Sequence, residues 1–538
     1  MGKRFLIFVT IKNGFFEFLH NMKYRLFLLA LALLAYACGN SPEPIPEEVP
    51  GPALVSTNPA DGTGGITDTK LTVAFTFDQN IICSPEGQQG IQADGGAFIS
   101  TVSVSGATLS VTVSGLSRGK SYVVTLPAGT VKGYKQNQKS SAAITYRFSM
   151  KEPDPPVPGG FETAATCVKN MGVGWNLGNT LESNSGDVAN MWIESSTQRR
   201  PSDYEKAWGQ TDATRALIHM FKEAGFGAIR VPVTWYPHMG TLELNGNFWN
   251  KDRWLESTNY TVDRVWMARV KEVVDYVIDE GMYCILNVHH DTGTASTGWL
   301  KADKEVYASV RNRYISLWTQ IASEFESYGE KLVFESFNEM LDADNRWTYA
   351  NKEADDAINT INADFVATVR ATGGNNVNRN LILKTYAASP DRRALQDFEL
   401  PKDVVQDHLM AQVHSYAPYH FAFNPGEGES WSPQLTFDAN ADKEVRSIID
   451  VVGQTLVARG IPCILGEYGT DTREGPARDE AELAKQAACY ISQAAKYNIP
   501  CFYWMALSDG KEDRAAPRWT KPTLKDAILK AYQENKPR

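Results

Sequence analysis

Two carboxylates that follow strand-like apolar runs are the first candidates for chemistry in this chain. The run LVFESFNEML (332–341) carries Asn338 and Glu339 near its end, and the run PCILGEY (462–468) carries Glu467. Asn and Glu are disfavoured in strands, so we expect their side chains to leave the core there. One protonated and one ionised carboxylate can together cleave a glycosidic bond, and they need environments that push their pKa values apart.

Polar side chains also end most of the other apolar runs. These runs are VGWNL (173–177), AIRV (228–231), YCILNV (283–288), MAQVHSY (410–416) and CFYWMA (501–506). At their ends or just beyond stand Asn176, Asn179, Glu182, Arg230, Trp235, His289, His290, His414, Tyr416 and Trp504. A lone Arg or His is usually packed or paired, but burying the whole set without a task would cost on the order of several kcal/mol. The set therefore predicts a functional site.

The elements that must position these residues alternate along the chain from Phe161 onward. Short apolar runs, including LILKTY (381–386), alternate with segments such as TRALIHMFKEAG and WMARVKEVVDYVIDEG, whose apolar residues have helical spacing. This alternation predicts an α/β fold, a (β/α)₈ TIM barrel over residues 161–538, with the working groups at the C-terminal strand ends. A doubly wound sheet is the alternative, but GWNLGN is not the glycine-rich phosphate loop that such a sheet would have after its first strand.

The C-terminal body resembles glycoside hydrolase family 5, the cellulase family. The matching pieces, in order, are MGVGWNLGNTLES (171–183), AWGQTDATRALIHMFKEAGFGAIRVPVTW (207–235), CILNVHHD (284–291), LVFESFNEML, VHSYAP (413–418), ILGEYG (464–469) and FYWMALSDG (502–510). The resemblance implies a retaining mechanism without a cofactor, in which Glu339 is the acid/base and Glu467 the nucleophile. It also implies binding or supporting roles for Arg230, His289, His290, Asn338, His414, Tyr416, Trp504, Asn179 and Glu182, with Trp235 beside them.

The residue types suit these roles. Asn338 can hydrogen-bond the sugar 2-hydroxyl, Arg230 and Tyr416 can hold Glu467 ionised, and the ring of Trp504 can form the floor of a sugar subsite. The sequence His-His-Asp at 289–291 offers no further ligands at metal-binding spacing. We therefore expect no metal.

The N-terminus predicts an exported, lipid-anchored protein. From Met22 a charged segment, an apolar stretch and small residues lead to Cys38, as in a bacterial lipoprotein signal over residues 1–38. The alternative is plain secretion with Cys38 as a bystander. Lipidation at Cys38 would place the chain on the outer membrane, facing outward or toward the periplasm. The remaining six cysteines show no metal spacing, and we expect buried thiols rather than disulfides.

Two Pro-rich linkers, 39–51 and 151–160, enclose a segment with a different pattern. Residues 52–150 alternate apolar and polar side chains with period two, which predicts an all-β sandwich. VSTNPADGTGGI, LTVAFTFDQNI and YVVTLPAGTVKG resemble bacterial immunoglobulin-like domains. This resemblance implies a spacer, and a glycan-binding role lacks a clustered aromatic platform.

The expected partner is a polysaccharide. The net charge of −10 argues against nucleic acid. The leading hypothesis is an endo-β-1,4-glucanase, and the alternatives within the class are xyloglucan-, mixed-linkage-glucan- and mannan-specific endohydrolases. A glycan-binding lipoprotein or a vestigial barrel would be expected to lose a carboxylate or Arg230, and all are present.

Substrate choice is expected to depend on the loops. Residues 238–260, with Phe248, Trp249 and Trp254, could form an added sugar platform or pack on themselves. Trp431, after the sixth strand, could stack on a sugar or cap the barrel.

Overall fold

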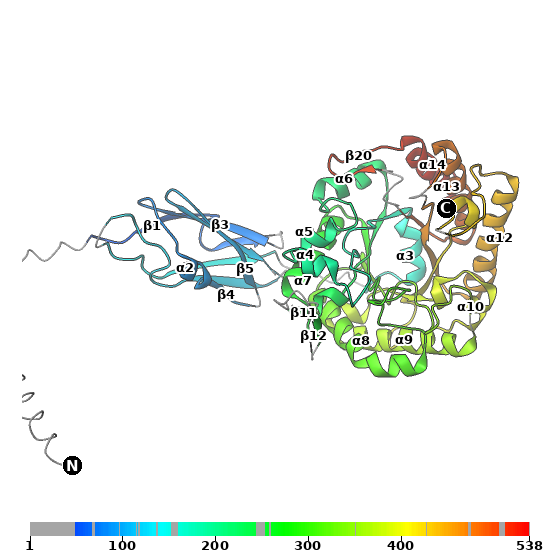
Figure 1. The fold of residues 1–538 in the computed structure, drawn as a ribbon, viewed down its shortest axis with the longest axis horizontal. Helices are drawn as coiled ribbons and strands as arrows, with labels where there is room; N and C mark the ends of the chain where they lie inside the picture. Colours follow the sequence, from blue (N-terminus) through cyan, green and yellow to red (C-terminus); the bar gives the residue numbers. More distant parts are fainter. Residues whose placement is uncertain are drawn as a thin grey trace, which may run out of the picture.

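The computed structural model describes residues 49–66, 70–95, 97–114, 116, 119–135, 138–151, 160–243, 253–257, 260–349, 351–426, 428–471, 475–504 and 512–536. Figure 1 shows a β-sandwich in blue and a barrel in cyan to red. The predicted signal over 1–38, its Cys38 and most of both predicted linkers lie outside the described residues. Within the described residues, none of the helices has the length and apolar character that a membrane span requires.

The N-terminal domain is a sandwich of two four-stranded sheets. One sheet has the order β1 (Leu54–Asn58), β3 (Lys70–Phe77), β6 (Thr108–Ser114), β5 (Phe98–Ser105), and the other β2 (Thr63–Ile66), β8 (Ile144–Met150), β7 (Ser121–Leu126), β4 (Gln92–Ala93). Along β3 the buried residues are Leu71, Val73, Phe75 and Phe77. The period-two pattern therefore predicts the buried face correctly. A short helix, α2 (Pro85–Gln89), lies on a connection.

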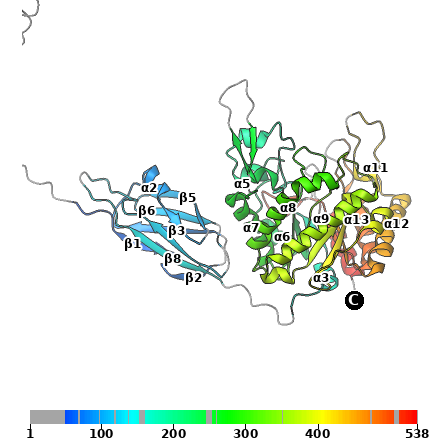
Figure 2. The ribbon, with the colours of Figure 1, turned by 90° about the horizontal axis from the view of Figure 1, so that it is seen from below.

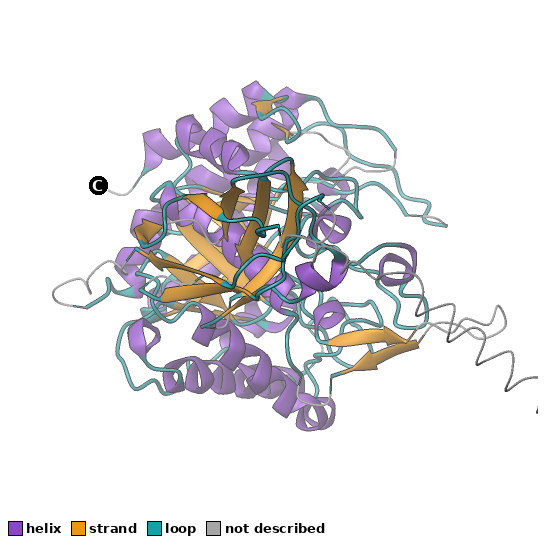
Figure 3. Cartoon of the chain, turned by 90° about the vertical axis from the view of Figure 1, so that its left-hand side faces the viewer, coloured by secondary structure: helices purple, strands orange, loops and turns teal. Residues whose placement is uncertain are grey.

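The C-terminal domain is the predicted closed barrel of eight parallel strands. The strands are β9 (Gly174–Asn176), β10 (Ala228–Val231), β13 (Tyr283–Asn287), β14 (Leu332–Glu335), β15 (Leu381–Lys384), β16 (Leu409–His414), β17 (Cys463–Tyr468) and β18 (Cys501–Tyr503). Each falls on one of the predicted apolar runs, and β18 pairs with β9 to close the ring. Figure 3 shows the strands at the centre with helices around them.

The helices form the outer layer (Figure 2). They are α3 (Ala164–Met171), α4 (Trp192–Ser196), α5 (Pro201–Glu205), α6 (Arg215–Ala224), α7 (Arg264–Asp279), α8 (Lys304–Glu324), α9 (Lys352–Ala371), α10 (Arg392–Asp397), α11 (Tyr419–Ala422), α12 (Ala439–Thr455), α13 (Glu480–Ala494) and α14 (Pro522–Asn535), with short 3₁₀ turns η1 (Tyr236–His238), η2 (Gly374–Val377), η3 (Tyr386–Ala388), η4 (Val457–Arg459) and η5 (Ala495–Tyr497). Local sequence sets their ends: the side chain of Thr214 accepts the N–H of Leu217 at the start of α6, and Gly225 ends it with φ 107°.

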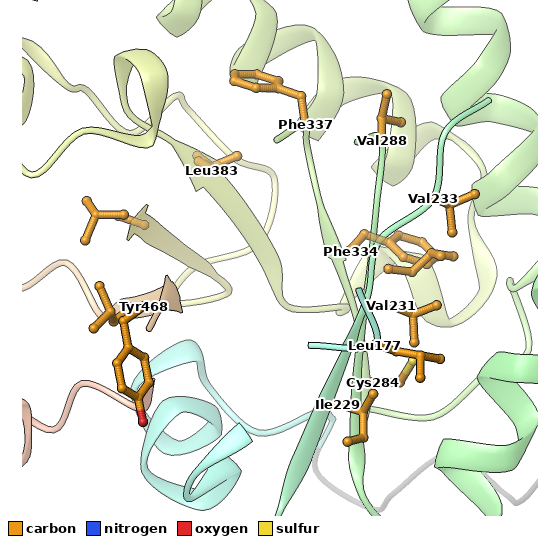
Figure 4. Packing of buried hydrophobic residues seen from close by; sticks show 14 of the residues in the cluster. Leu177, Ile229, Val231, Val233, Cys284, Val288, Phe334, Phe337, Leu383 and Tyr468 are labelled. Atoms are coloured by element: carbon orange, nitrogen blue, oxygen red, sulfur yellow. The ribbon is translucent and has the colours of Figure 1, made fainter. Parts of the chain in front are cut away.

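Alternate residues of each strand pack on opposite sides of the barrel wall. One set, including Ile229, Cys284 and Phe334, packs outward against the helices (Figure 4). The other set fills the interior with an apolar layer: Ala228, Ile285, Val333, Ile382, Met410, Ile464 and Phe502. Two residues further along, six of the eight strands have polar inward side chains: Asn176, Arg230, Asn287, Glu335, Lys384 and Gln412. The other two positions are Gly466 and Trp504. The same alternation that builds the core therefore places the site above it.

The six described cysteines are free thiols, and all but Cys83 are buried. The expected burial is therefore found for Cys167, Cys284, Cys463, Cys489 and Cys501 but not for Cys83. Two small hairpin sheets, β11 (Gly240–Glu243) with β12 (Arg253–Glu256) and β19 (Glu512–Asp513) with β20 (Arg518–Trp519), lie on connections outside the barrel wall.

Candidate active site

The structure brings the two predicted catalytic carboxylates together at the barrel mouth. Glu339 follows β14 and Glu467 lies in β17, and His414 at the end of β16 contacts both. The His414 Nδ1 atom is 2.7 Å from Glu339 Oε1 and 3.6 Å from Glu467 Oε2. One carboxylate oxygen of each Glu and one ring nitrogen all lie within 4.8 Å of one another.

Glu467 is held as a carboxylate by donors on both oxygens. Arg230 Nη1 donates to Glu467 Oε1 at 2.6 Å, and the Tyr416 hydroxyl donates to Oε2 at 2.8 Å. Only 4% of Glu467 is exposed. Charge-assisted hydrogen bonds of this kind are short and directional, so they fix the orientation of the carboxylate that is to act as nucleophile.

Glu339 has the opposite environment. Burial raises its pKa to about 8, and the negative charge of Glu467 adds to the effect. The side chain still exposes about a fifth of its surface. Glu339 is therefore protonated at neutral pH and reachable from solvent, as a general acid must be.

Arg230 organises the floor of the site. Its fully buried guanidinium donates from Nε and Nη2 to Glu335 at 2.7 Å each, and from Nη1 to Asn176 Oδ1 at 3.0 Å. Nη2 also donates to Asn338 Oδ1 at 2.8 Å. Because Arg can only donate, the Oδ1 of Asn338 faces Arg230, and its amide N–H groups remain available for a sugar hydroxyl.

Glu335 is a third carboxylate, which the sequence analysis missed. Besides Arg230, it accepts from Gln412 at 3.0 Å and Asn287 at 3.2 Å, and Lys384 Nζ lies 3.3 Å away. Burial alone would oppose ionisation, but the charges of Arg230 and Lys384 prevail and lower the pKa of Glu335 to about 2. The sequence could have indicated Glu335 through the strand alternation, because Glu335 lies two residues beyond the inward-facing, buried Val333 and so faces the same side.

His289 and Trp504 form one wall. Asn287 Oδ1 accepts from the Val233 backbone, so its amide Nδ2 faces His289 Nδ1 at 3.0 Å as a donor. This leaves the hydrogen of His289 on Nε2. Burial lowers the pKa of His289 well below its usual value, so the ring is neutral. The ring of the half-buried Trp504 lies nearly parallel to it, at 3° and 5.8 Å.

His290 lies beside this wall, 4.6 Å from His289 between ring centres, and its other neighbour is Trp208 at 5.3 Å. Burial lowers the pKa of His290 to about 4. The sequence analysis did not select Trp208, whose half-buried ring donates from Nε1 to the Asn184 carbonyl at 3.2 Å.

Two residues predicted to bind or support the substrate, Glu182 and Trp235, are fully buried, and their contacts match the supporting role. Glu182 is fully buried, and its carboxylate accepts backbone N–H groups from Asn179 and Thr180, so it shapes the loop after β9 rather than facing a sugar. Trp235 is also fully buried, and its indole donates to the Asn287 carbonyl at 3.0 Å. Asn179 is 6% exposed and has φ 56°, a left-handed conformation that Asn tolerates.

The open alternatives for the loop aromatics are resolved only in part. Trp254 is half-buried and packs on Tyr236, with ring centres 6.0 Å apart, which matches the self-packing interpretation. Phe248 and Trp249 lie outside the described residues. Trp431 stacks on His420 at 4.5 Å, with 10° between the rings.

Among the described residues, Glu339, His414 and Glu467 are close enough to hold a cation. A cation there would have to displace the proton that Glu339 carries in this environment. Asp291 of the His-His-Asp sequence is occupied instead, since it accepts from the backbones of Trp235 and Tyr236 and from the Trp299 indole. The expectation of no metal stays a prediction.

Comparison with known proteins agrees with this geometry. Residues 185–510, more than half of the chain, match the family "Cellulase (glycosyl hydrolase family 5)". Residues 48–150 match the family "Bacterial Ig-like domain", in agreement with the predicted N-terminal sandwich. Endoglucanase A of Clostridium longisporum is 33% identical over 386 residues, which cover 70% of this chain and 67% of that protein.

Solved structures give the same result. A family 5 glycoside hydrolase from Prevotella bryantii, in complex with a xyloglucan tetradecasaccharide, is 37% identical with a TM-score of 0.60, over 69% of this chain and 99% of that chain. A broad specificity endoglucanase from Ruminococcus champanellensis with bound cellotriose is 35% identical with a TM-score of 0.58, over 68% of this chain and 98% of that chain.

Proposed function

We propose that this chain, which belongs to glycosyl hydrolase family 5, is a retaining endo-β-1,4-glucanase that cleaves β-glucan polysaccharides. The observation that carries the proposal is the pair of carboxylates in unlike environments, Glu467 with donors on both oxygens and Glu339 protonated by burial. Their nearest ligand atoms lie within 4.8 Å. Retaining enzymes separate the two carboxyl groups by about 5–5.5 Å, whereas inverting enzymes need about 6.5–9.5 Å.

In the first step Glu467 attacks the anomeric carbon. The bond between that carbon and the glycosidic oxygen breaks, and Glu339 transfers its proton to this oxygen as the reducing-end part of the chain departs. A covalent glycosyl-enzyme ester forms at Glu467. Asn338, with its amide N–H groups free, can hold the 2-hydroxyl of the sugar whose bond is cleaved.

In the second step Glu339, now ionised, takes a proton from water as the water oxygen attacks the same carbon. The ester bond breaks, Glu467 is released as a carboxylate, and Glu339 is again protonated. Two displacements at one carbon give net retention.

The relatives support a proposal for the substrate class. One relative is described as a broad specificity endoglucanase and another was solved with a xyloglucan oligosaccharide. We therefore expect cleavage of β-1,4-glucan backbones, including xyloglucan and mixed-linkage glucan. The alternative within the family is a mannan-directed enzyme.

The exported, lipid-anchored location is a separate proposal that rests on the N-terminal sequence. Cys38 would carry the lipid, the immunoglobulin-like domain would act as a spacer, and the barrel would meet polysaccharide at the outer membrane. Labelling of cells with a radioactive fatty acid should mark the wild-type protein and not a Cys38→Ala variant. Equal labelling of both would refute the anchor.

The activity is tested with soluble carboxymethylcellulose, mixed-linkage glucan, xyloglucan, glucomannan and galactomannan. New reducing ends from at least one glucan, absent with Glu339→Gln and Glu467→Gln, are the expected result. Activity on galactomannan alone would move the assignment to the mannan-directed alternative. A folded protein that binds a glucan without cleaving it would refute the proposal.

A further inference from the structure

The end of β15 carries a lysine that the predicted catalytic set leaves out. Lys384 is fully buried and points inward, with Nζ 2.8 Å from His414 Nε2 and 3.3 Å from Glu335 Oε1. It also donates to Gln412 Oε1. A charged ammonium has three N–H donors and no acceptor. Here it meets three acceptors, and one of them belongs to the ring that contacts Glu339.

The neighbours of Lys384 fix the orientation of the Gln412 side-chain amide. Gln412 Nε2 donates to Glu335 Oε2 at 3.0 Å, so the amide oxygen of Gln412 must face Lys384 and His414. This oxygen lies 3.1 Å from His414 Nε2. Gly466 makes room for this arrangement, because a Cβ at that position would lie 2.3 Å from the amide carbon of Gln412.

The charge of Lys384 decides the tautomer of His414. Burial and the charge of Lys384 lower the pKa of His414 well below its usual value, so the ring is neutral and carries one hydrogen. Burial lowers the pKa of Lys384 to about 8, which leaves it mostly charged at pH 7. A hydrogen on His414 Nε2 would face an N–H of Lys384 across 2.8 Å. The hydrogen is therefore on Nδ1, which points at Glu339.

We infer that Lys384 is a positioning residue for the acid catalyst, because it fixes His414 in the tautomer that donates from Nδ1 to Glu339 Oε1. That oxygen lies 2.7 Å from Nδ1 and accepts. The acidic proton of Glu339 is then held on Oε2, free for the glycosidic oxygen. The inference rests on the proposed function, in which Glu339 protonates the leaving group.

Removal of Lys384 frees the other tautomer. His414 Nε2 can then carry the hydrogen and donate to Gln412 Oε1, which already lies 3.1 Å away. In that state Nδ1 has a lone pair toward Glu339 and accepts the proton that the substrate needs. The variant should therefore lose proton donation to the leaving group while it keeps the nucleophile.

The kinetic test uses aryl β-cellobiosides with Lys384→Met. A phenyl leaving group needs the acid, whereas 2,4-dinitrophenolate departs without it. General acid catalysis contributes about 10²–10⁴-fold. We expect kcat/KM for the phenyl substrate to fall about 100-fold or more, and that for the dinitrophenyl substrate by less than about 5-fold, if acid assistance alone is lost. An equal loss for both substrates would overturn the inference.

Lys271→Met is the matched control. Lys271 on α7 is also buried and also lies 3.3 Å from a carboxylate oxygen, that of Glu324, but it is not among the groups around the site. It should leave the ratio of the two kcat/KM values at the wild-type level. A change in that ratio equal to the change in Lys384→Met would count against a role specific to Lys384.

A second measurement needs neither of the two lysine variants and no substrate turnover. The ring nitrogens of ¹⁵N-histidine-labelled wild-type protein report each tautomer by NMR, with His414 assigned by its loss in His414→Gln. At pH 7 we expect the hydrogen on Nδ1. A hydrogen on Nε2 would overturn the inference whatever the activity, whereas inactivity on every glycoside with Nδ1–H would refute only the proposed function.

Discussion

Replacement of Glu335 by Gln tests the electrostatics under the site. Glu335 is fully buried, accepts two hydrogen bonds from Arg230 at 2.7 Å, and lies 3.3 Å from Lys384. Its pKa falls from 4.5 to about 2 on folding. A pKa difference of one unit corresponds to about 1.4 kcal/mol, so the ionised form adds roughly 3 kcal/mol to stability near neutral pH. Breaking a buried ion pair costs about 3–5 kcal/mol, a similar amount.

The sign of the pH dependence follows from the depressed pKa. The stabilisation by Glu335 is fully present above pH 4.5, the value in the unfolded chain, and is lost as the pH falls toward about 2. Glu335→Gln should therefore be less stable than the wild type by about 3 kcal/mol at pH 7. The difference should shrink below pH 4.5 as the wild-type carboxylate is protonated.

Urea unfolding monitored by tryptophan fluorescence suits this measurement. All 13 tryptophans follow residue 160, so the signal reports on the barrel alone. Glu223→Gln, which changes an exposed carboxylate on α6, is the control and should change stability by less than about 0.5 kcal/mol. A loss for Glu335→Gln below about 1 kcal/mol at pH 7, or a loss that is constant from pH 7 to pH 3, would refute the reasoning.

Four further predictions concern Glu339, Glu467 and the neighbouring Gly466. The raised pKa of Glu339 means that its ionisation opposes folding between pH 4.5 and about 8. In urea titrations, Glu339→Gln should therefore gain stability relative to the wild type as the pH rises through that range. A gain that does not depend on pH would contradict the raised pKa. The alkaline limb of the pH profile of kcat/KM should have its midpoint near pH 8. An alkaline midpoint below pH 6 would show that another group is the acid. Glu467→Ala with added azide should yield an α-glycosyl azide and Glu339→Ala a β-glycosyl azide, as determined by NMR of the products; the opposite pairing would exchange the two roles. Gly466→Ala should cost about 1–3 kcal/mol because the added Cβ meets Gln412 at 2.3 Å, and a neutral result in urea unfolding would show that the Gln412 amide can move.

Much of the barrel could be predicted because strand and helix periods are local. Each apolar run became a strand, and the residues at the strand ends converged, since parallel strands of a closed barrel end at one rim. Glu339, Glu467 and Arg230 were found in this way. The helix over 215–224 likewise follows from its N-cap Thr214 and the glycine after it.

The burial of individual loop residues could not be predicted from the sequence. Glu182 and Trp235 have residue types that suit sugar binding. The carboxylate of Glu182 instead accepts N–H groups from Thr180 and from Asn179, which has a left-handed conformation, and the indole of Trp235 donates to the sequence-distant Asn287 carbonyl. Glu335 and Lys384 were missed for a different reason. Both lie within apolar runs typical of buried strands. Only the alternation of inward and outward positions distinguishes them from their apolar neighbours.

The apolar layer inside the barrel has a consequence for protons. Ala228, Ile285, Val333, Ile382, Met410, Ile464 and Phe502 are almost or fully inaccessible and lie beneath the charged side chains. Among the described residues, this layer separates Glu335, Lys384 and Glu339 from the opposite end of the barrel. A polysaccharide chain that lies over the barrel mouth would slow proton exchange between the site and bulk water. The proton that leaves with one half of the substrate is replaced by the water that completes the same turnover.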